Sequence, residues 1–145
     1  MKLIEIYTDG SCLFNPGKGG WAGILMFNGK EKCISGAENN TTNNRMELTA
    51  VIKSLESLKE PCEVNLYSDS SYVINAFEQN WIDNWRKNNW RTSNKKDVLN
   101  KDLWEKLSNL VSIHNVHFIK VKGHSDNEYN NRCDVMARGE ASKIW

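Results

Sequence analysis

The chain has 145 residues, of which 26% are charged and 39% hydrophobic, and its formal net charge is +1. This length fits one globular domain, and the near-balanced charge excludes both a wholly basic nucleic-acid coat and an acidic disordered chain. Since the sequence has two prolines and nine glycines, a fibrous or low-complexity class is excluded as well.

Apolar runs and cysteines indicate in which cellular compartment the protein works. No apolar run approaches the roughly 20 residues that a membrane-spanning helix needs, and Glu5 would interrupt a signal-peptide core at the start. The four cysteines, Cys12, Cys33, Cys62 and Cys133, are scattered without a CxxC pair. They predict free thiols rather than a disulfide framework or a zinc site. We therefore expect a cytoplasmic protein with no membrane partner. The sequence leaves the oligomeric state open, and a monomer is the expected state.

Positive charge is concentrated in one Trp-containing segment, residues 81–101. Six cations and two anions give this segment a net charge of +4, which leaves −3 for the rest of the chain. Its three tryptophans are interleaved with the cations Arg86, Lys87, Arg91, Lys95, Lys96 and Lys101. The pattern predicts a phosphate-contacting patch attached to a mildly acidic body.

The first third of the chain has the pattern of three antiparallel strands. Lys2–Thr8 is apolar and β-branched, and Asp9-Gly10 is expected to end this first strand before a loop. Gly19–Phe27 and Lys30–Ser35 flank Asn28-Gly29, the strongest short signal for a hairpin. We therefore expect an antiparallel meander.

Helices separate the remaining strands. Apolar residues at helical spacing predict core-facing helices over 48–58 and 99–111. Short strands are expected at Glu63–Tyr67 and Val116–Val121, with a basic loop at Arg91–Asp97 between them. The final helix is expected to bury Cys133, Met136, Ala137 and Ala141. Because strands separated by helices join a sheet in parallel, the expected fold is an α/β (mixed α+β) domain with a mixed five-stranded sheet flanked by helices.

Four carboxylates stand beside the ends of these elements. Asp9 and Asp69 follow strands, while Glu47 and Asp134 lie in the first turns of helices. Mg²⁺ takes carboxylates, waters and substrate phosphates as ligands, and two ions about 3.5–4 Å apart can stabilise the attacking and leaving oxygens of a phosphodiester displacement. If the four carboxylates converge, a cation is their expected partner, because they would otherwise repel one another.

Each carboxylate also has a purely structural interpretation. Asp9 can belong to a turn, and Glu47 can close a capping box that begins at Asn44. Asp69 can cap the following helix, and Asp134 can pair with Arg138 one turn later. Spacing alone does not show that the four side chains meet.

Four segments occur in an order and at spacings that are distinctive together, although any one of them alone is a weak signal. They are Tyr7–Cys12 with Asn15-Pro16-Gly17, Thr41–Leu48, Ser68–Val73, and Val121–Ser125 followed by Asn131–Asp134. Together with the Trp-containing basic segment, they resemble bacterial type 1 ribonuclease H over nearly the whole chain.

This resemblance implies an endonuclease that hydrolyses the RNA strand of RNA–DNA hybrids with little sequence specificity and leaves 5′-phosphate and 3′-hydroxyl ends. It assigns the metal-binding carboxylates of the family to Asp9, Glu47, Asp69 and Asp134. It implies Mg²⁺, with Mn²⁺ as the alternative, and two ions in the substrate complex. It assigns the family's mobile histidine to His124, for which a solvated surface histidine is the alternative interpretation.

The resemblance also implies substrate contacts. On the RNA side these involve the backbone of Gly10, Ser11 and Cys12 and the side chains of Asn43, Asn44, Glu47 and Ser71. On the DNA side they involve Asn15 and Thr42, near a phosphate. A basic protrusion at about 81–101 would bind substrate through Trp81, Trp85, Lys87, Trp90, Arg91, Lys95 and Lys96. Helix capping by the two asparagines and helix packing by the tryptophans are the structural alternatives.

The sequence departs from the family pattern at three positions. Phe14 stands where a small residue is common, Ser71 where glutamine is frequent, and Asp126 where glycine is frequent. None of these departures removes a carboxylate. Two rival functions stay open: a non-catalytic module that binds hybrids, and a nuclease or recombinase of the same fold that acts on DNA.

Overall fold

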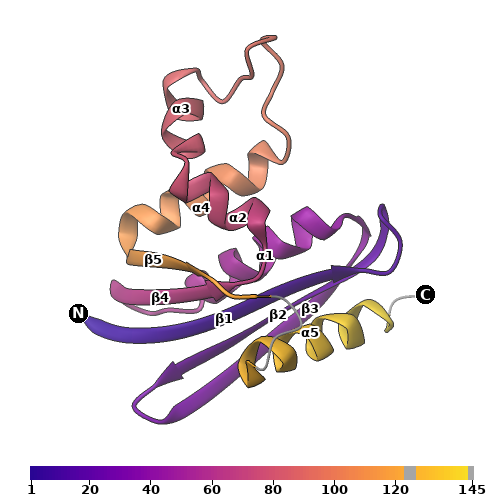
Figure 1. Ribbon diagram of the computed structural model, residues 1–145, viewed down its shortest axis with the longest axis vertical. Helices are drawn as coiled ribbons and strands as arrows, with labels where there is room; N and C mark the ends of the chain where they lie inside the picture. Colours follow the sequence, from indigo (N-terminus) through magenta and orange to yellow (C-terminus); the bar gives the residue numbers. More distant parts are fainter. Residues whose placement is uncertain (123–126, 144–145) are drawn as a thin grey trace.

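The computed structural model describes residues 1–122 and 127–143 and consists of a mixed five-stranded sheet with helices on both faces (Figure 1). The strands are β1 (Lys2–Cys12), β2 (Gly17–Phe27), β3 (Lys30–Thr41), β4 (Cys62–Ser68) and β5 (Asn115–Lys120). The helices are α1 (Asn43–Glu56), α2 (Ser71–Glu78), α3 (Trp81–Lys87), α4 (Lys101–Ile113) and α5 (Glu128–Ala141).

The sheet has the predicted topology, with strand order β3-β2-β1-β4-β5. β1, β2 and β3 pair antiparallel, whereas β1 with β4 and β4 with β5 pair in parallel. Asn28 and Gly29 both have left-handed backbone angles, with φ of 50° and 77°, as the tight turn between β2 and β3 requires. The first half of the chain is therefore a meander, and helices connect the later strands.

The expectation that Asp9-Gly10 ends the first strand is wrong. β1 continues to Cys12 because Asp9 still pairs with Ala22 and Cys12 with Gly19 of β2. On its other side β1 loses its partner earlier, since the last pair with β4 joins Tyr7 to Tyr67. Asp9 therefore lies on a strand that is paired along one edge and open along the other.

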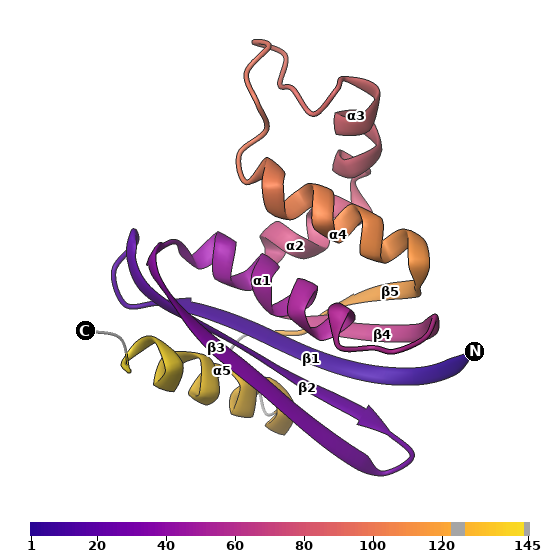
Figure 2. The same cartoon turned by 180° about the vertical axis from the view of Figure 1, so that it is seen from behind.

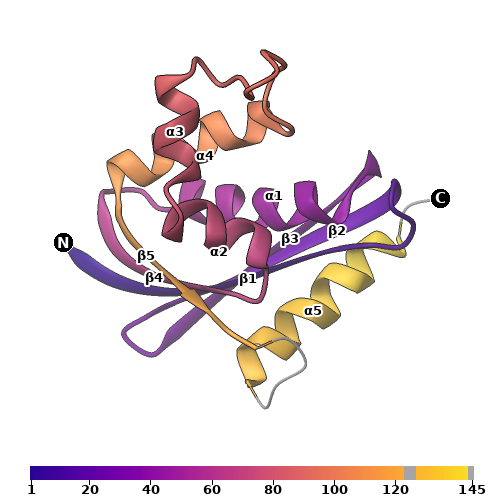
Figure 3. The ribbon, with the colours of Figure 1, turned by 45° about the horizontal axis from the view of Figure 1, so that its top comes forward.

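Two layers of helices cover the sheet. In Figures 1 and 2, α1, α2 and α4 lie on one face and α5 lies on the other. Figure 3 shows α5 alone on its side of the strands. The main core lies between the sheet and the first group of helices, and a smaller cluster under α5 contains Cys133 and Ala137, both fully buried as predicted. Met136 is only partly buried.

Two predicted details of the helices are wrong. α1 is capped by Thr42, whose side-chain oxygen accepts a hydrogen bond from Arg45 N, so Asn44 and Glu47 form no capping box. Leu99 is 73% exposed and precedes α4, so that the core-facing residues of this segment begin at Leu103. In the first case a motif placed the cap two residues too late, and in the second the apolar periodicity began the helix before the core-facing residues do.

The segment between α2 and α4 projects from the body as a protrusion, which includes α3 and the following loop. Its base is an aromatic cluster in which Trp85 lies with its ring centroid 5.4 Å from that of Trp104 and 6.1 Å from that of Trp90. Trp104 is fully buried, and its Nε1–H donates to the Tyr72 hydroxyl at 2.9 Å. No helix among the described residues is both long and apolar enough to cross a membrane.

Candidate nuclease active site

Asp9 and Glu47 are brought together by a close approach of two backbones. Gly10 packs directly against the backbone of Met46 and Glu47, so that a Cβ at position 10 would collide with it. Only a glycine permits this approach between β1 and the first turns of α1. As a result the carboxylate that precedes Gly10 and the carboxylate of Glu47 face the same space.

Asp69 enters this space from β4, the strand beside β1. It directly follows Ser68, the last residue of β4, and Ser70 rather than Asp69 caps α2 by accepting a hydrogen bond from Val73 N. Carboxylate oxygens of Asp9, Glu47 and Asp69 all lie within 4.8 Å of one another. These three acids therefore form a group that can hold a metal ion.

Asp134 reaches the same place from the other face of the sheet. α5 packs tightly on β2, where Gly20 leaves no room for a Cβ beside the carbonyl oxygen of Ala137. Asp134 lines one pocket of about 240 Å³ together with Asp9, Glu47 and Asp69. It also forms the expected ion pair with Arg138, at 3.0 Å, so the structural interpretation of Asp134 is confirmed.

Burial and mutual repulsion raise the pKa of two of these acids, Asp9 and Glu47. Burial, followed by the charge of Asp69, raises the pKa of Asp9 to about 8 in the metal-free protein. Burial and the charge of Asp9 raise the pKa of Glu47 well above its usual range. The fold thus holds carboxyl groups where an unpaired negative charge is unfavourable, and a bound cation would reverse that preference.

The donor set of the pocket fits a hard divalent cation. Glu47 Oε2 and Asn130 Oδ1 are buried, and neither has a hydrogen-bond partner in the part of the chain that the structure describes. An unsatisfied buried oxygen is costly, and both residues line the pocket that contains Asp9, Asp69 and Asp134. Carboxylate and amide oxygens are ligands that Mg²⁺ and Mn²⁺ accept.

Several of the predicted substrate-binding residues lie around this pocket. Gly10, Ser11 and Asn43 line it directly. Asn15 is tied to the beginning of α1, because its Oδ1 accepts a hydrogen bond from Asn43 N at 3.2 Å. Asn44 is exposed. Thr42 is the helix cap, Ser71 is the exposed first residue of α2, and Cys12 is half-buried at the end of β1.

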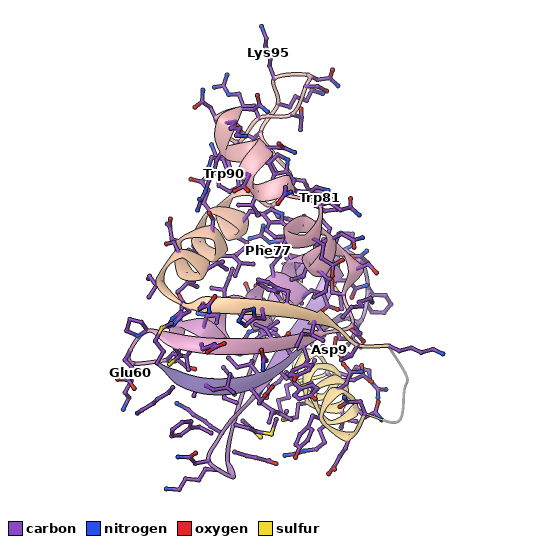
Figure 4. The ribbon with its side chains drawn as sticks, turned by 60° about the vertical axis from the view of Figure 1, so that its left-hand side comes forward. Asp9, Glu60, Phe77, Trp81, Trp90 and Lys95 are labelled. Atoms are coloured by element: carbon purple, nitrogen blue, oxygen red, sulfur yellow. The ribbon has the colours of Figure 1, made fainter. Side chains whose placement is uncertain are left out.

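The protrusion separates its tryptophans from its cations. Trp81, Trp85 and Trp90 are half-buried and lie in a row with tilted rings, so that packing accounts for much of their surface. Lys87, Arg91, Lys95 and Lys96 are exposed. Figure 4 shows Lys95 at the tip, with Trp81 and Trp90 near the base, and Asp9 in the body well below them. The basic groups therefore stand apart from the acidic pocket.

One predicted residue lies outside this description and two were missed. His124 falls among residues 123–126, which the structure does not describe. Asn130 and Asn131 line the acidic pocket although the motif analysis gave them no role. Their spacing was a usable signal, because residues four and three positions before Asp134 share its face of a helix.

Comparison with known proteins agrees with this geometry. The family model for RNase H matches residues 1–142. Ribonuclease H of Acetivibrio thermocellus is 59% identical over 143 residues, which cover 99% of this chain and 97% of that protein. Ribonuclease H of Thermoanaerobacter sp. (strain X514) is 62% identical over 137 residues, which cover 94% of this chain and 88% of that protein.

Solved structures of low sequence identity share the fold. The crystal structure of LC9-RNase H1, a type 1 RNase H with the type 2 active-site motif, superposes with a TM-score of 0.88 at 25% identity and covers 99% of this chain and 74% of that chain. LC11-RNase H1 in complex with an RNA/DNA hybrid gives a TM-score of 0.72 at 23% identity, with 97% of each chain covered. Since the family model and the two bacterial relatives each match at least 94% of its length, the chain belongs to the RNase H family.

Proposed function

We propose that residues 1–145 form a single catalytic domain that hydrolyses the RNA strand of RNA–DNA hybrids. The observation that carries the proposal is the convergence of Asp9, Glu47 and Asp69 within 4.8 Å, in a pocket that Asp134 also lines. The high identity to bacterial proteins named Ribonuclease H supports the same activity. Cleavage is endonucleolytic, depends little on sequence, and leaves 5′-phosphate and 3′-hydroxyl ends in a cytoplasmic, monomeric enzyme.

In this proposal the four carboxylates hold the catalytic metal, which is Mg²⁺ with Mn²⁺ as a substitute. The substrate complex contains two such ions. Bound there, the ions supply positive charge to the attacking and leaving oxygens of the scissile phosphodiester. The protein contributes position: β1, α1 and β4 fix three carboxylates before substrate arrives, so little reorganisation is needed during the reaction. By resemblance, His124 assists proton transfer or product release.

Substrate selection requires a ribose on one strand and a deoxyribose on the other. The 2′-hydroxyl groups are displayed in the wide, shallow minor groove of the hybrid. In our proposal the backbone of Gly10–Cys12 and the side chains of Asn43, Asn44, Glu47 and Ser71 lie along the RNA strand. Short amides and hydroxyls suit this role because they both donate and accept hydrogen bonds.

The DNA strand is held in two places. Thr42 and Asn15 contact a phosphate near the pocket; with its oxygen bonded to Asn43 N, the Asn15 side chain presents its NH₂ group as the donor. Farther out, the exposed Lys87, Arg91, Lys95 and Lys96 contact phosphates, while Trp81, Trp85 and Trp90 support them. This division keeps strong positive charge away from the carboxylates.

A cleavage assay with end-labelled substrates tests the proposal. We expect an RNA–DNA hybrid to be cut with Mg²⁺ present and left intact with excess chelator, while duplex RNA and duplex DNA survive both conditions. Binding of the hybrid without any cleavage would indicate a non-catalytic binding module instead. Cleavage of duplex DNA would indicate a DNA nuclease or recombinase of the same fold.

A further inference from the structure

The turn between β1 and β2 presents two large apolar side chains to water. Phe14 is 73% exposed and the adjacent Leu13 is 47% exposed. A single exposed apolar residue is ordinary on a protein surface, but Phe14 and Leu13 form an exposed apolar pair beside a polar pocket, where a bound ligand would meet it.

The turn is held firmly, so Phe14 is presented at a fixed place. Leu13 N–H donates to the carbonyl of Lys18 at 2.8 Å, and the Cys12 thiol donates to the carbonyl of Phe14 at 2.6 Å. A Cβ at Gly17 would collide with the Phe14 carbonyl, so the chain closes tightly behind the ring. Because the backbone of the turn is already ordered, a contact made by Phe14 costs little backbone entropy on binding.

The same turn is joined to the candidate active site. The Asn15 side chain accepts a hydrogen bond from Asn43 N at 3.2 Å, and Asn43 lines the pocket with Asp9 and Glu47. In Figures 1 and 3 the β1–β2 turn and the loop of the protrusion lie on the same side of the molecule, with the beginning of α1 between them. Phe14 is therefore one residue from the side chain that links this turn to the pocket-lining Asn43.

We propose that Phe14 is a specificity-determining residue whose ring packs against a deoxyribose of the DNA strand. This inference rests on the proposed function, and it assigns the ring a role beside the phosphate contact of its neighbour Asn15. A deoxyribose presents a CH₂ group at C2′, where a ribose presents a hydroxyl. Burying that hydroxyl under an apolar ring without a hydrogen-bond partner is unfavourable, whereas burying CH₂ is favourable.

The test compares Phe14→Ala with Phe14→Leu, both in the cleavage-deficient Asp69→Asn background so that the substrate stays intact. The Kd for a hybrid is measured by fluorescence anisotropy with Mg²⁺ present, first with an all-deoxy DNA strand and then with single ribonucleotides placed along that strand. With Phe14 present, we expect one ribonucleotide position to weaken binding by about tenfold. Phe14→Ala should weaken binding of the all-deoxy hybrid by about tenfold and remove the penalty at that position. Phe14→Leu should keep most of both effects.

Ile113→Ala is the matched control, because Ile113 is 54% exposed and lies at the far end of α4. It should leave the Kd and the ribonucleotide penalty unchanged. An unchanged Kd and an unchanged penalty in Phe14→Ala would overturn the inference while leaving the proposed function intact. If the protein with Phe14 present neither binds nor cuts a hybrid, the proposed function fails and this inference fails with it.

Discussion

The acidic pocket and the basic protrusion handle charge in opposite ways. In the pocket, three carboxylates from different elements are drawn within 4.8 Å of one another, and burial with repulsion raises the pKa of Asp9 to about 8. In the protrusion, Lys87, Lys95 and Lys96 are exposed over a base of packed tryptophans. The pocket buries negative charges close together, which costs free energy that a bound cation can offset. The protrusion exposes its positive charges to water, where they cost little free energy.

Under the proposed function, this difference predicts a division of work between the two regions. The groups of a buried, crowded site are held in place. Such a site can therefore select an ion and fix the positions of the reacting atoms. An exposed set of flexible cations provides affinity that is not specific and that salt weakens. Substitutions in the pocket should therefore change turnover, and substitutions in the protrusion should change binding.

The largest effect is expected for Asp69→Asn, which removes one charge from the pocket without changing its shape. We expect kcat for hybrid cleavage to fall by a factor on the order of a thousand or more, because the metal loses a ligand, while hybrid binding survives. Steady-state cleavage and anisotropy measure the two quantities. Asp83→Asn is the matched control in the exposed part of the protrusion and should leave kcat unchanged. Wild-type turnover in Asp69→Asn would contradict the assignment of the metal site.

The next largest effect concerns the base of the protrusion. Trp104→Ala leaves a cavity under Trp85 and Tyr72, and we expect the free energy of unfolding to fall by about 3–5 kcal/mol. Trp104→Phe keeps a ring but loses the Nε1–H···Tyr72 hydrogen bond, which should cost about 1 kcal/mol beyond the change in packing. Urea denaturation measures both variants. A loss below about 1 kcal/mol in Trp104→Ala would show that the cluster does not anchor the protrusion.

The raised pKa of Asp9 predicts a dependence of stability on pH in the metal-free protein. The folded state holds this proton up to about pH 8, whereas the unfolded chain releases it near 3.8. The stabilisation is therefore fully present below about pH 4 and is lost as the pH rises through 8. We expect the drop in the free energy of unfolding between pH 5 and pH 8 to be smaller in Asp9→Asn by at least about 1.4 kcal/mol, the equivalent of one pKa unit.

Thermal or urea unfolding in chelator at the two pH values measures this difference. Mg²⁺ should raise the stability of the wild type more at pH 8 than at pH 5, because the ion competes with the protons. Equal pH dependence in the wild type and Asp9→Asn would show that Asp9 titrates as an ordinary surface carboxyl.

The smallest effect is expected from the protrusion cations. Replacing Lys87, Lys95 and Lys96 together by alanine should raise KM several-fold and leave kcat nearly unchanged. The slope of log K against log salt concentration should fall by about 0.9 for each phosphate that the variant no longer neutralises. Replacement of three exposed lysines outside the protrusion, Lys30, Lys32 and Lys59, is the charge-matched control. An unchanged KM at moderate salt would refute a substrate-binding role for the protrusion.

Local sequence determined those features that depend on neighbouring residues. Asn28-Gly29 forms the predicted turn, because both positions need left-handed backbone angles that these residues adopt readily. The alternation of strands and helices predicted the mixed sheet, and the four scattered cysteines are free thiols as expected. For Trp81, Trp85 and Trp90 the sequence allows both substrate binding and helix packing, and the structure shows packing over part of their surface.

Only the tertiary structure decided how the distant groups meet. Asp9 and Glu47 are neighbours because Gly10 lets β1 touch the backbone of α1, and Asp69 joins them because β4 lies parallel to β1. The extension of β1 to Cys12 likewise depends on its pairing with β2. Local propensity acts over a few residues, whereas these arrangements arise from packing between segments far apart in the chain. Asp9 and Glu47 therefore acquire their raised pKa values only after the sheet and helices have assembled.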